Sequence, residues 1–308
     1  MTHDNYFNKL ISDLRKDKVN CLQYLINTLS PYILCDHFIS NEIHSPRIKV
    51  GIRKQKSFLK QISQKNDLLK TKDFNRIKNF DIILCQVNFL TYFYEQVIPL
   101  LGIKKVVLIT CQTSLPQINR NTMTDQILNS EKIILWISQN PIYDNTDKYY
   151  AFPYGLKYIS VDKYTNVLLK SKKIKKKKKI HHSYLGLNHP CRQKLPQVQQ
   201  CNHKNFYRQI SSSKYMISPI GDRDDCFRHY ESIGLGTIPI SNVHPYYKNI
   251  FEDNMVITDI DSMVKILKDN KISHKYRIPN RGLISFKYHR DKIIKLINKK
   301  KCLNSKNQ

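Results

Sequence analysis

The chain has 308 residues, of which 52 are lysine or arginine and 24 are aspartate or glutamate, so its formal net charge at pH 7 is +28. Hydrophobic residues make up 41% of the sequence, which is enough for folded cores and excludes a wholly disordered chain. The apolar runs are far shorter than the roughly 20 residues of a membrane-spanning helix, and the N-terminus has no apolar signal segment. We therefore expect a soluble, non-secreted protein.

The charge favours an anionic partner: nucleic acid, a membrane surface or a phosphate-bearing substrate. Many lysines lie in one run, Lys170–Lys179, which we interpret as a solvated linker that also offers contact with an anionic surface. The eight cysteines form no C-x-x-C pair, so we expect no disulfide framework. Histidines and cysteines recur between His181 and His203, but their spacing matches no structural-zinc pattern, and we expect no metal there.

In chain order, two helical patterns come first, at 4–14 and 21–29, and the second ends before Pro31. Short β-branched runs then alternate with helical patterns, which is typical of a parallel sheet covered by helices. The predicted strands are 47–52, 80–87, 105–110 and 132–137, and the predicted helices are 57–70, 91–101 and 121–129.

The sequence "FPYGL" at 152–156 breaks this pattern with a proline and a glycine, and the basic run follows. The alternation then restarts, with predicted strands at 180–185, 214–218, 237–240 and 255–258, helices at 226–235 and 261–268, and a C-terminal helix. The fold class is therefore α/β, with two Rossmann-like domains. We predict an N-terminal domain over 1–158, a basic linker over 159–179, and a C-terminal domain over 180–308.

The segment 213–240 has a strand–loop–helix–strand pattern with unusual loop chemistry. In open parallel sheets, ligands bind beyond the carboxyl ends of the strands, where the loop 219–225 is expected. Gly221 lets the backbone approach a ligand closely, and Asp224 or Asp225 is the expected N-cap of the following helix. The first turn of that helix offers unpaired N–H groups, which suit a phosphate.

Asp224, Arg228 and Glu231 are spaced i, i+4 and i+7, so they share one face of the predicted helix. Arg228 can bind a phosphate through two hydrogen bonds, and Glu231 can accept hydrogen bonds from two adjacent hydroxyls, as in a ribose. The alternative is a surface face on which Arg228 bridges Asp224 and Glu231. Periodicity alone leaves both interpretations open, and neither G-x-x-x-x-G-K-[ST] nor G-x-G-x-x-G occurs.

The stretch "SKYMISPIGDRDDCFRHYESIGLGTIPI" resembles the nucleotide-sugar motif of exostosin-like glycosyltransferases. The matching positions are Ser213, Lys214, Pro219, Gly221, Asp225, Arg228, Glu231, Gly236, Ile238, Pro239 and Ile240. Arg223 and Phe227 depart from the motif, since the family often has glycine and histidine there. The segments "KIILWISQNPI", "YYAFPYGL" and "NHPCR" are more faintly similar to other segments of the family.

The resemblance implies the GT-B arrangement, in which two Rossmann-like domains face each other across a cleft. It implies that Arg192 and Arg228 hold the diphosphate and that Glu231 binds ribose or sugar hydroxyls. Ser218, Gly221 and Asp225 would belong to the donor loop, and Asn140 and Gly155 would line the cleft from the other side. The implied activity is inverting transfer of a hexose or pentose from a nucleotide sugar to a hydroxyl of a glycan or protein, without metal or other cofactor.

The catalytic base stays open among Asp81, Glu95 and Asp125. The acidic run 222–225 also resembles a metal-binding motif, but its place before a helix favours capping, and we expect no divalent ion. Two other functions remain: a basic nucleic-acid-binding protein, and a non-catalytic relative that only binds nucleotide sugars. Because eukaryotic members of the family are usually anchored in the secretory pathway, we expect a cytoplasmic or virus-encoded member.

Overall fold

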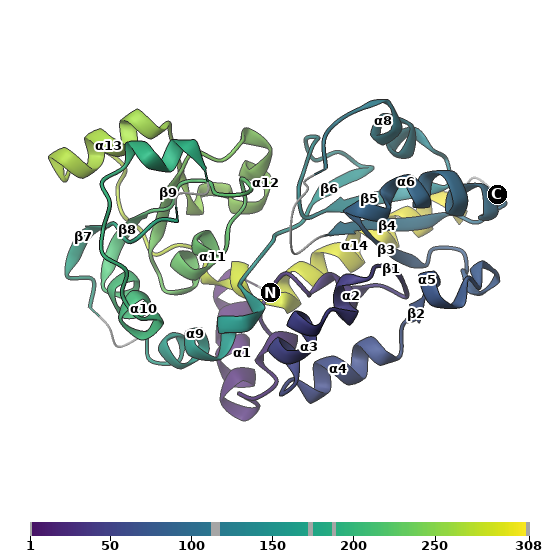
Figure 1. The fold of residues 1–308 in the computed structure, drawn as a ribbon, viewed down its shortest axis with the longest axis horizontal. Coiled ribbons are helices and arrows are strands. Elements are labelled where there is room, and N and C mark those ends of the chain that lie inside the picture. Colours follow the sequence, from purple (N-terminus) through teal and green to yellow (C-terminus); the bar gives the residue numbers. More distant parts are fainter. Residues whose placement is uncertain (1, 112–117, 172–174, 187–188, 306–308) are drawn as a thin grey trace. The chain divides into compact units, whose positions relative to one another are not determined.

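The computed structural model describes residues 2–111, 118–171, 175–186 and 189–305 and divides into two compact units (Figure 1). Unit 1 comprises Met1–Asn27 and Tyr154–Tyr288, and unit 2 comprises Thr28–Pro153 and His289–Gln308. Each unit contains one sheet of parallel strands, four in unit 1 and six in unit 2. The predicted α/β class with two parallel sheets is confirmed. No helix of the described residues is both long and apolar enough to cross a membrane.

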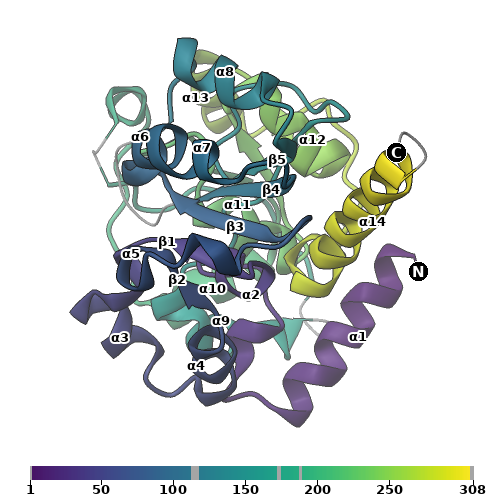
Figure 2. The ribbon, with the colours of Figure 1, turned by 90° about the vertical axis from the view of Figure 1, so that its right-hand side faces the viewer.

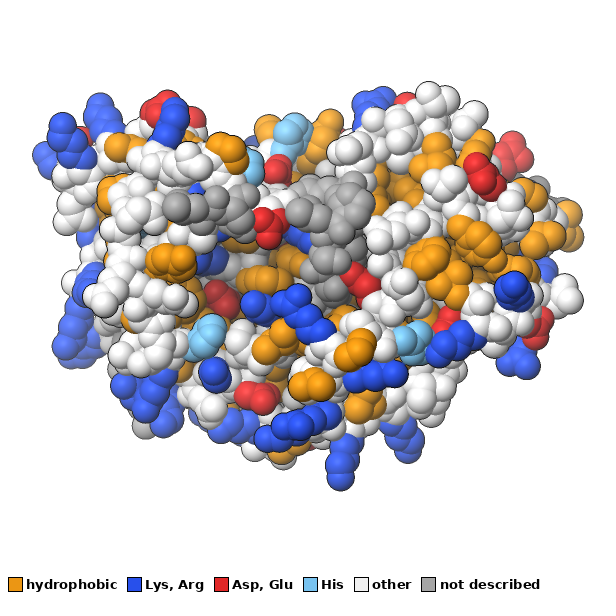
Figure 3. Space-filling view, viewed as in Figure 1, with side chains coloured by type: hydrophobic (Ala, Val, Ile, Leu, Met, Phe, Trp, Pro, Cys, Tyr) orange, Lys and Arg blue, Asp and Glu red, His pale blue; other side chains and the backbone are white. Residues whose placement is uncertain are grey.

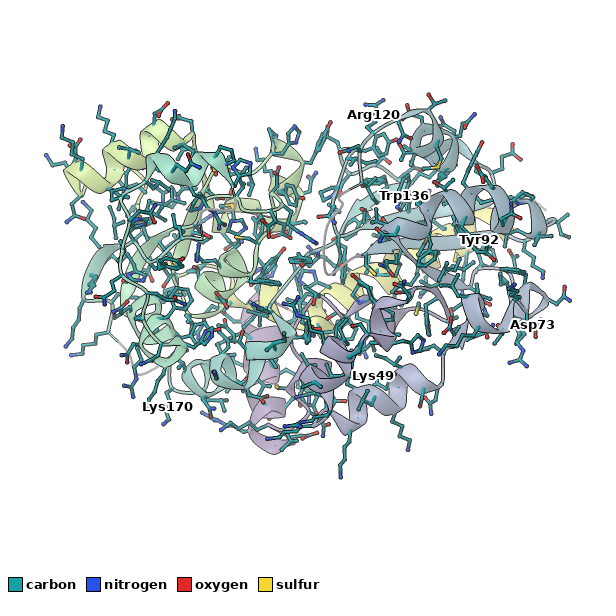
Figure 4. All side chains as sticks on the ribbon, viewed as in Figure 1. Lys49, Asp73, Tyr92, Arg120, Trp136 and Lys170 are labelled. Atoms are coloured by element: carbon teal, nitrogen blue, oxygen red, sulfur yellow. The ribbon has the colours of Figure 1, made fainter. Side chains whose placement is uncertain are left out.

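The sheet of unit 2 has the order β2-β1-β3-β4-β5-β6, with every neighbouring pair parallel. Its strands are β1 (His37–Ile39), β2 (Asn66–Asp67), β3 (Ile82–Gln86), β4 (Val106–Cys111), β5 (Ile133–Ser138) and β6 (Tyr149–Ala151). The strands β4 and β5 are buried along their whole length, as expected for a sheet covered on both faces. Trp136 is fully buried in β5, and its Nε1 donates to Thr110 Oγ1 at 2.9 Å (Figure 4).

The helices of unit 2 cover both faces of this sheet, with α6 and α14 on opposite faces (Figures 1 and 2). They are α2 (Pro31–Leu34), α3 (Pro46–Ile52), α4 (Lys56–Ser63), α5 (Leu68–Thr71), α6 (Leu90–Tyr92), α7 (Ile98–Leu100), α8 (Thr122–Asn129) and α14 (Phe286–Ser305). A π-helical turn, Phe93–Val97, joins α6 to α7. The predicted helices at 91–101 and 121–129 therefore correspond to helical segments. The predicted helix at 57–70 is wrong in part, because α4 ends at Ser63 and strand β2 lies between α4 and α5.

One predicted strand of unit 2 is wrong, because residues 47–52 form α3. Ser45 caps this helix by accepting a hydrogen bond from Ile48 N at 3.3 Å, and Pro46 occupies its first turn. The buried residues Ile48 and Ile52 are four apart, which is helical spacing. The first strand is instead β1, a three-residue segment that the sequence analysis missed, and the predicted helix at 21–29 is only a 3-10 turn at Cys21–Gln23.

The sheet of unit 1 has the order β10-β9-β8-β7, again with parallel pairs only. Its strands are β7 (Lys178–His181), β8 (Ser213–Ile217), β9 (Ile238–Ser241) and β10 (Val256–Ile257). Each of the four predicted strands overlaps one of these, but the predicted strand 180–185 continues beyond the end of β7 at His181. The helices are α1 (His3–Lys16), α9 (Val161–Leu168), α10 (His203–Ser211), α11 (Phe227–Gly234), α12 (Lys248–Phe251) and α13 (Ile260–Asp269). Tyr215, Ile217 and Ile238 lie in the core between this sheet and α13.

The division into units differs from the predicted domains at both chain ends. Residues 1–27, predicted in the N-terminal domain, belong to unit 1, where Ile26 N donates to Ile284 O and Phe286 N donates to Tyr24 O, both at 2.9 Å. The Arg281 guanidinium also lies 3.9 Å from the centre of the Phe7 ring. From His289 onward, α14 belongs to unit 2, where Ile293 is buried. Nothing in the sequence of a terminal segment shows which core it packs against. Assigning these segments by their order in the chain therefore places them in the other unit.

The predicted basic linker, 159–179, is in large part folded. It contains α9, whose residues Tyr164 and Leu168 are almost completely buried, and it ends within β7. Lys176 is half-buried, and its Nζ donates to Leu235 O and Thr237 Oγ1, both at 2.9 Å. The apolar spacing of α9 is easily missed in the sequence, because the lysines that follow dominate the composition of this segment. Residues 172–174 of the run lie outside the described residues.

Candidate functional site

The loop 218–226 follows β8 and leads into α11, so it lies at the carboxyl edge of the four-stranded sheet, as predicted. The helix begins at Phe227 with Cys226 as its N-cap. The prediction of an aspartate N-cap is therefore wrong. Asp224 accepts a hydrogen bond from His244 N at 3.0 Å, and Asp225 is buried beneath the loop, so both carboxylates are engaged elsewhere.

Arg192 holds the loop from below. Its guanidinium donates from Nε to Ile220 O at 2.7 Å, from Nη1 to Gly186 O at 3.1 Å, and from Nη2 to Pro219 O at 3.3 Å. A Cβ at Gly221 would overlap with this guanidinium, so the glycine is required by the close approach of the arginine. The predicted pair Arg192 and Gly221 thus meets in the structure, but Arg192 shapes the loop through backbone carbonyls.

Asp225 is the centre of a buried network. Its Oδ2 accepts from Tyr154 N at 2.9 Å and from the Tyr230 hydroxyl at 2.5 Å, and its Oδ1 lies 3.5 Å from His229 Nδ1. His229 Nε2 bonds to the carbonyl of Ser218 at 3.0 Å. Burial lowers the pKa of His229, but Cys226 and Asp225 outweigh it and raise the pKa to about 10. Asp225 and Ser218 therefore act as supports of the loop.

The adjoining thiol, that of Cys226, is half-buried at the helix N-terminus. Burial raises its pKa, but His229 and Arg228 outweigh this effect and lower the pKa to about 7. The Cys226 thiol and the His229 imidazole therefore shift each other's pKa, and the thiol lies at the N-terminus of α11.

Arg228 is in the first turn of α11, and its guanidinium is only partly bonded. Its Nη2 donates to Tyr184 O at 3.2 Å, whereas no hydrogen-bond partner reaches its buried Nε within the described part of the chain. Burial and the nearby Arg192 lower the pKa of Arg228. The alternative in which Arg228 bridges Asp224 and Glu231 is wrong, because these carboxylates bond to other groups and form no ion pair with it among the described residues.

Glu231 lies one turn after Arg228 and is 7% exposed. Its Oε1 accepts a hydrogen bond from the Tyr207 hydroxyl at 2.9 Å. Burial raises the pKa of Glu231, and the charge of Arg228 and the bond from Tyr207 oppose this shift. A carboxylate that is oriented by a tyrosine and faces a guanidinium is placed to accept hydrogen bonds from ligand hydroxyls.

Polar atoms at the end of β7 and just after it also lie at the carboxyl edge of the unit 1 sheet. His181 Nε2 and Ser183 Oγ are buried and meet no hydrogen-bond partner in the described residues, in side chains that are 6% and 5% exposed. Burial and neighbouring positive charges lower the pKa of His181 to about 4, which makes it a neutral imidazole at pH 7. Buried polar groups without partners are costly, and they mark a place where water or a ligand completes the bonding.

The sequence analysis missed His181, Ser183 and Tyr207. For the first two, a signal existed: the polar residues "HHS" interrupt the predicted strand 180–185, which is typical of the end of a buried parallel strand, and polar residues at the carboxyl end of a strand meet the ligand. Tyr207 carries no such signal, because only the packing of α10 on α11 brings it to Glu231.

Gly155, predicted to line a cleft from the other domain, belongs to unit 1 with the loop itself. Its φ is +80°, and a Cβ there would lie 2.7 Å from the backbone of Ile26 and Asn27. The preceding Tyr154 bonds to Asp225 through its backbone, and its ring stacks on Phe227 with centroids 5.0 Å apart. Gly155 is thus a tight backbone contact that positions Tyr154 against the start of α11.

Asn140 lies just after β5, at the carboxyl edge of the sheet of unit 2. It is 3% exposed, and both polar atoms of its side chain are without hydrogen-bond partners in the described residues. The strand order of this sheet reverses between β1 and β3, and ligands of doubly wound folds bind at such a switch point. Ser40 and Gln86 follow these strands and bond to each other at 3.0 Å.

None of the three candidate bases occupies the open part of this edge. Asp81 precedes β3, at the amino edge, where it bonds to His37 Nε2 at 2.8 Å. Glu95 is exposed on the π-helical turn, and Asp125 on α8 accepts from the Tyr143 hydroxyl at 2.7 Å. Glu42, which the analysis did not consider, follows β1 at the carboxyl edge and is 8% exposed.

The described residues contain no group of three or more histidine, cysteine, aspartate or glutamate side chains arranged to hold a metal ion. Comparisons with known proteins add no assignment: the chain matches no protein-family model, and the search of curated proteins gives no match.

Proposed function

We propose that the protein is a glycosyltransferase that moves a sugar from a nucleotide sugar to a hydroxyl acceptor. The observation that carries this proposal is the set of unsatisfied polar atoms at the carboxyl edge of the unit 1 sheet: Arg228 Nε, His181 Nε2 and Ser183 Oγ. They lie at or next to the residues that surround the N-terminus of α11, an environment that suits a phosphate. The resemblance of the loop to the exostosin-like nucleotide-sugar motif agrees with this ligand class.

In this proposal the diphosphate of the donor accepts hydrogen bonds from the first turn of α11 and from Arg228. The Arg228 guanidinium and the N-terminus of α11 hold positive charge next to the diphosphate. When the glycosidic bond breaks, its electron pair stays with the nucleoside diphosphate, and the positive charge stabilises this leaving group. Arg192 contributes by holding the carbonyls of Pro219 and Ile220, so that the loop keeps its shape. Glu231, oriented by Tyr207, accepts hydrogen bonds from hydroxyls of the ribose or the sugar.

We further propose that unit 2 supplies the acceptor side of a GT-B arrangement. Its carboxyl edge offers neutral groups, Asn140, Gln86 and Ser40, which suit a hydroxyl-rich ligand. Glu42 is the first carboxylate to test as the base that takes the proton of the acceptor hydroxyl. No divalent ion is required, since two guanidinium groups and a helix N-terminus already provide positive charge.

The test is a thermal-shift and calorimetry panel of nucleoside diphosphates and nucleotide sugars on the full chain. A matching nucleoside diphosphate should raise Tm by mass action, and inorganic phosphate at the same concentration should not. Arg228→Ala should weaken that binding about 10- to 100-fold, since hydrogen bonds to charged groups contribute about 1.5–3 kcal/mol each.

Arg208→Ala is the matched control, because Arg208 is an exposed arginine of the same unit. Equal weakening in both variants, or no preference for any nucleoside diphosphate over phosphate, would refute the donor site. Donor hydrolysis or transfer by the wild type then separates an enzyme from a relative that only binds. Glu42→Gln should abolish transfer while nucleoside diphosphate binding persists.

A further inference from the structure

A pocket of about 280 Å³ lies at the start of the unit 1 sheet, and its lining is dominated by lysines. It is lined by Lys176, Lys177, Lys178, Lys179, Lys214, Tyr215, Ile272, His274 and Tyr276. Five of the nine lining residues are lysines and none is acidic. In Figure 3, blue side chains gather along the margin of unit 1 where β7 lies.

The pocket is separate from the donor loop. Lys178 begins β7 and pairs with Ser213 at the start of β8, whereas the donor loop follows Ile217 at the opposite end of β8. Five residues of extended strand place these two ends about 13 Å apart. The proposed function therefore uses one end of the sheet and leaves the other end unexplained.

The charges of the pocket are not neutralised from within. Among the described residues, no carboxylate lies within 4.0 Å of the amino group of Lys177, Lys178, Lys179 or Lys214. All four of these side chains are exposed. Lysines that line one depression give it a positive potential, and this potential attracts an anion.

The floor of the pocket is fixed by hydrogen bonds. The hydroxyl of Tyr215 donates to His274 O at 2.6 Å, and that of Tyr276 donates to Gly236 O at 2.8 Å. Lys176 Nζ is held by two acceptors at 2.9 Å, and burial lowers its pKa to about 7, a shift that a bound anion would oppose. Flexible lysines thus surround a rigid base.

The shape and the aromatic rings argue for a compact ligand and against stacked bases. Tyr215 is 1% exposed, and Lys214 Nζ lies 5.8 Å from the centre of the Tyr276 ring. Tyr215 and Tyr276 also contact each other edge to face, with 5.8 Å between the ring centroids. Tyr215 therefore offers no open face on which single-stranded nucleic acids could stack, and Lys214 lies near the ring of Tyr276.

The geometry points to a second anion site: the pocket formed by Lys176–Lys179 and Lys214 binds a compact anion that carries several phosphate groups. Binding there is independent of the donor loop. The wall lysines adapt to the phosphates, because each ammonium is a point charge on a flexible stem.

The test uses inorganic tripolyphosphate and the full chain, with calorimetry at about 0.1 M salt, where exposed charges still interact over roughly 10 Å. All measurements are made in the wild type and in Arg228→Ala, so that any binding at the donor loop is identified. The double variant Lys178→Gln/Lys214→Gln should weaken tripolyphosphate binding about tenfold or more, in line with the loss of charged hydrogen bonds. Its Tm without ligand should stay near the wild-type value, since both side chains are exposed.

The matched control is Lys248→Gln/Lys265→Gln, which removes the same charge from two exposed lysines of unit 1 that do not line the pocket. This control should bind tripolyphosphate within about twofold of the wild type, as expected for distant, screened charges. Equal weakening in the two double variants would overturn the site in favour of a general charge effect. Loss of binding in Arg228→Ala would assign tripolyphosphate to the donor loop and would equally overturn it.

A single-stranded DNA 20-mer provides the last arm. If it binds more tightly than tripolyphosphate, and if the Lys178→Gln/Lys214→Gln change abolishes that binding, the surface is a nucleic-acid interface and the proposal is wrong. If tripolyphosphate binds more tightly, the compact ligand is supported. Because these readouts use inorganic tripolyphosphate and DNA, they remain distinct from the nucleoside diphosphate test of the proposed function.

Discussion

The two ends of the four-stranded sheet in unit 1 are both positively charged, but they hold their charge differently. At the carboxyl end, Arg192 is 7% exposed and bonds to three backbone carbonyls, and Arg228 is held by the carbonyl of Tyr184. At the amino end, four lysines are exposed and only Lys176 is fixed. Rigid guanidinium groups select a ligand by its geometry, whereas flexible ammonium groups select it by its charge.

The two ends of the sheet also differ in whether their charged residues hold the site in shape or would contact the ligand. At the carboxyl end, most of the predicted site residues, Arg192, Ser218, Gly221 and Asp225, position the loop, and in the proposed function only Arg228 and Glu231 contact the ligand. At the amino end, the lysines themselves would meet the ligand, with two tyrosines as their support. Variants of the first region should therefore change stability as well as binding, and variants of the second should change binding alone.

The largest effect is expected for Asp225→Ala, which leaves His229, Tyr230 and the Tyr154 N–H without their shared acceptor. Breaking a buried ionic network of this kind costs about 3–5 kcal/mol of unfolding free energy. Urea unfolding gives this quantity. Asp261→Ala removes an exposed partner of Lys194 and serves as control, with little change expected. If the two variants are equally stable, the buried network does not hold the loop.

Gly221→Ala should be next, since its Cβ would overlap with the Arg192 guanidinium. Overpacking of this kind costs about 1–3 kcal/mol. A double-mutant cycle with Arg192→Ala isolates the clash: alanine at 221 should cost much less once the arginine is gone. Additive effects in urea unfolding would show that the glycine and the arginine do not depend on each other.

Salt should separate the two ends by a smaller margin. Exposed charges are screened as ionic strength rises, and buried charges are screened much less. From 0.05 to 0.3 M NaCl, the affinity for tripolyphosphate should therefore fall more steeply than the affinity for a nucleoside diphosphate. Calorimetry of both ligands over this range gives the two slopes. Equal slopes would mean that the two ends hold charge in the same way.

The last prediction concerns Lys176, a half-buried residue whose pKa is lowered by burial from 10.5 to about 7. Between these two values the unfolded chain binds more protons than the folded chain, so this lysine makes stability rise with pH over that window. Lys176→Met removes the contribution. Measured by urea unfolding at pH 7, 8.5 and 10, the unfolding free energy of the wild type minus that of the variant should therefore increase as pH rises; a constant value would contradict the shift.

The sequence predicted the strands of both sheets where apolar β-branched runs coincide with burial on both faces, as in β4, β5 and β8. It failed at residues 47–52, where the same residue types form a helix because Ser45 and Pro46 favour a helix start. It also failed for β1 and β6, which have three residues each and too little pattern to read. Short segments are specified by their neighbours in space.

For the site, motif and edge rules placed the loop at the carboxyl edge of the unit 1 sheet and Arg228 and Glu231 on the helix that follows it, as the structure has them. These rules could not distinguish a residue that would contact a ligand from one that holds the loop in place. That distinction depends on which polar atoms have no hydrogen-bond partner after folding. Arg192 shows the limit: as a charged residue near a phosphate motif it reads as a ligand contact, yet three carbonyls occupy its guanidinium. Only the folded structure shows which groups the Arg192 guanidinium bonds to.

The interleaving of the two units along the chain has a consequence for biosynthesis. Unit 1 joins Met1–Asn27 to Tyr154–Tyr288, and unit 2 is completed by residues after His289. Domains generally fold as units while the chain leaves the ribosome. Here the first helix has to wait for segments made more than a hundred residues later, so neither unit is complete until α14 has been made, and a stop shortly before α14 should leave both units exposed to proteases.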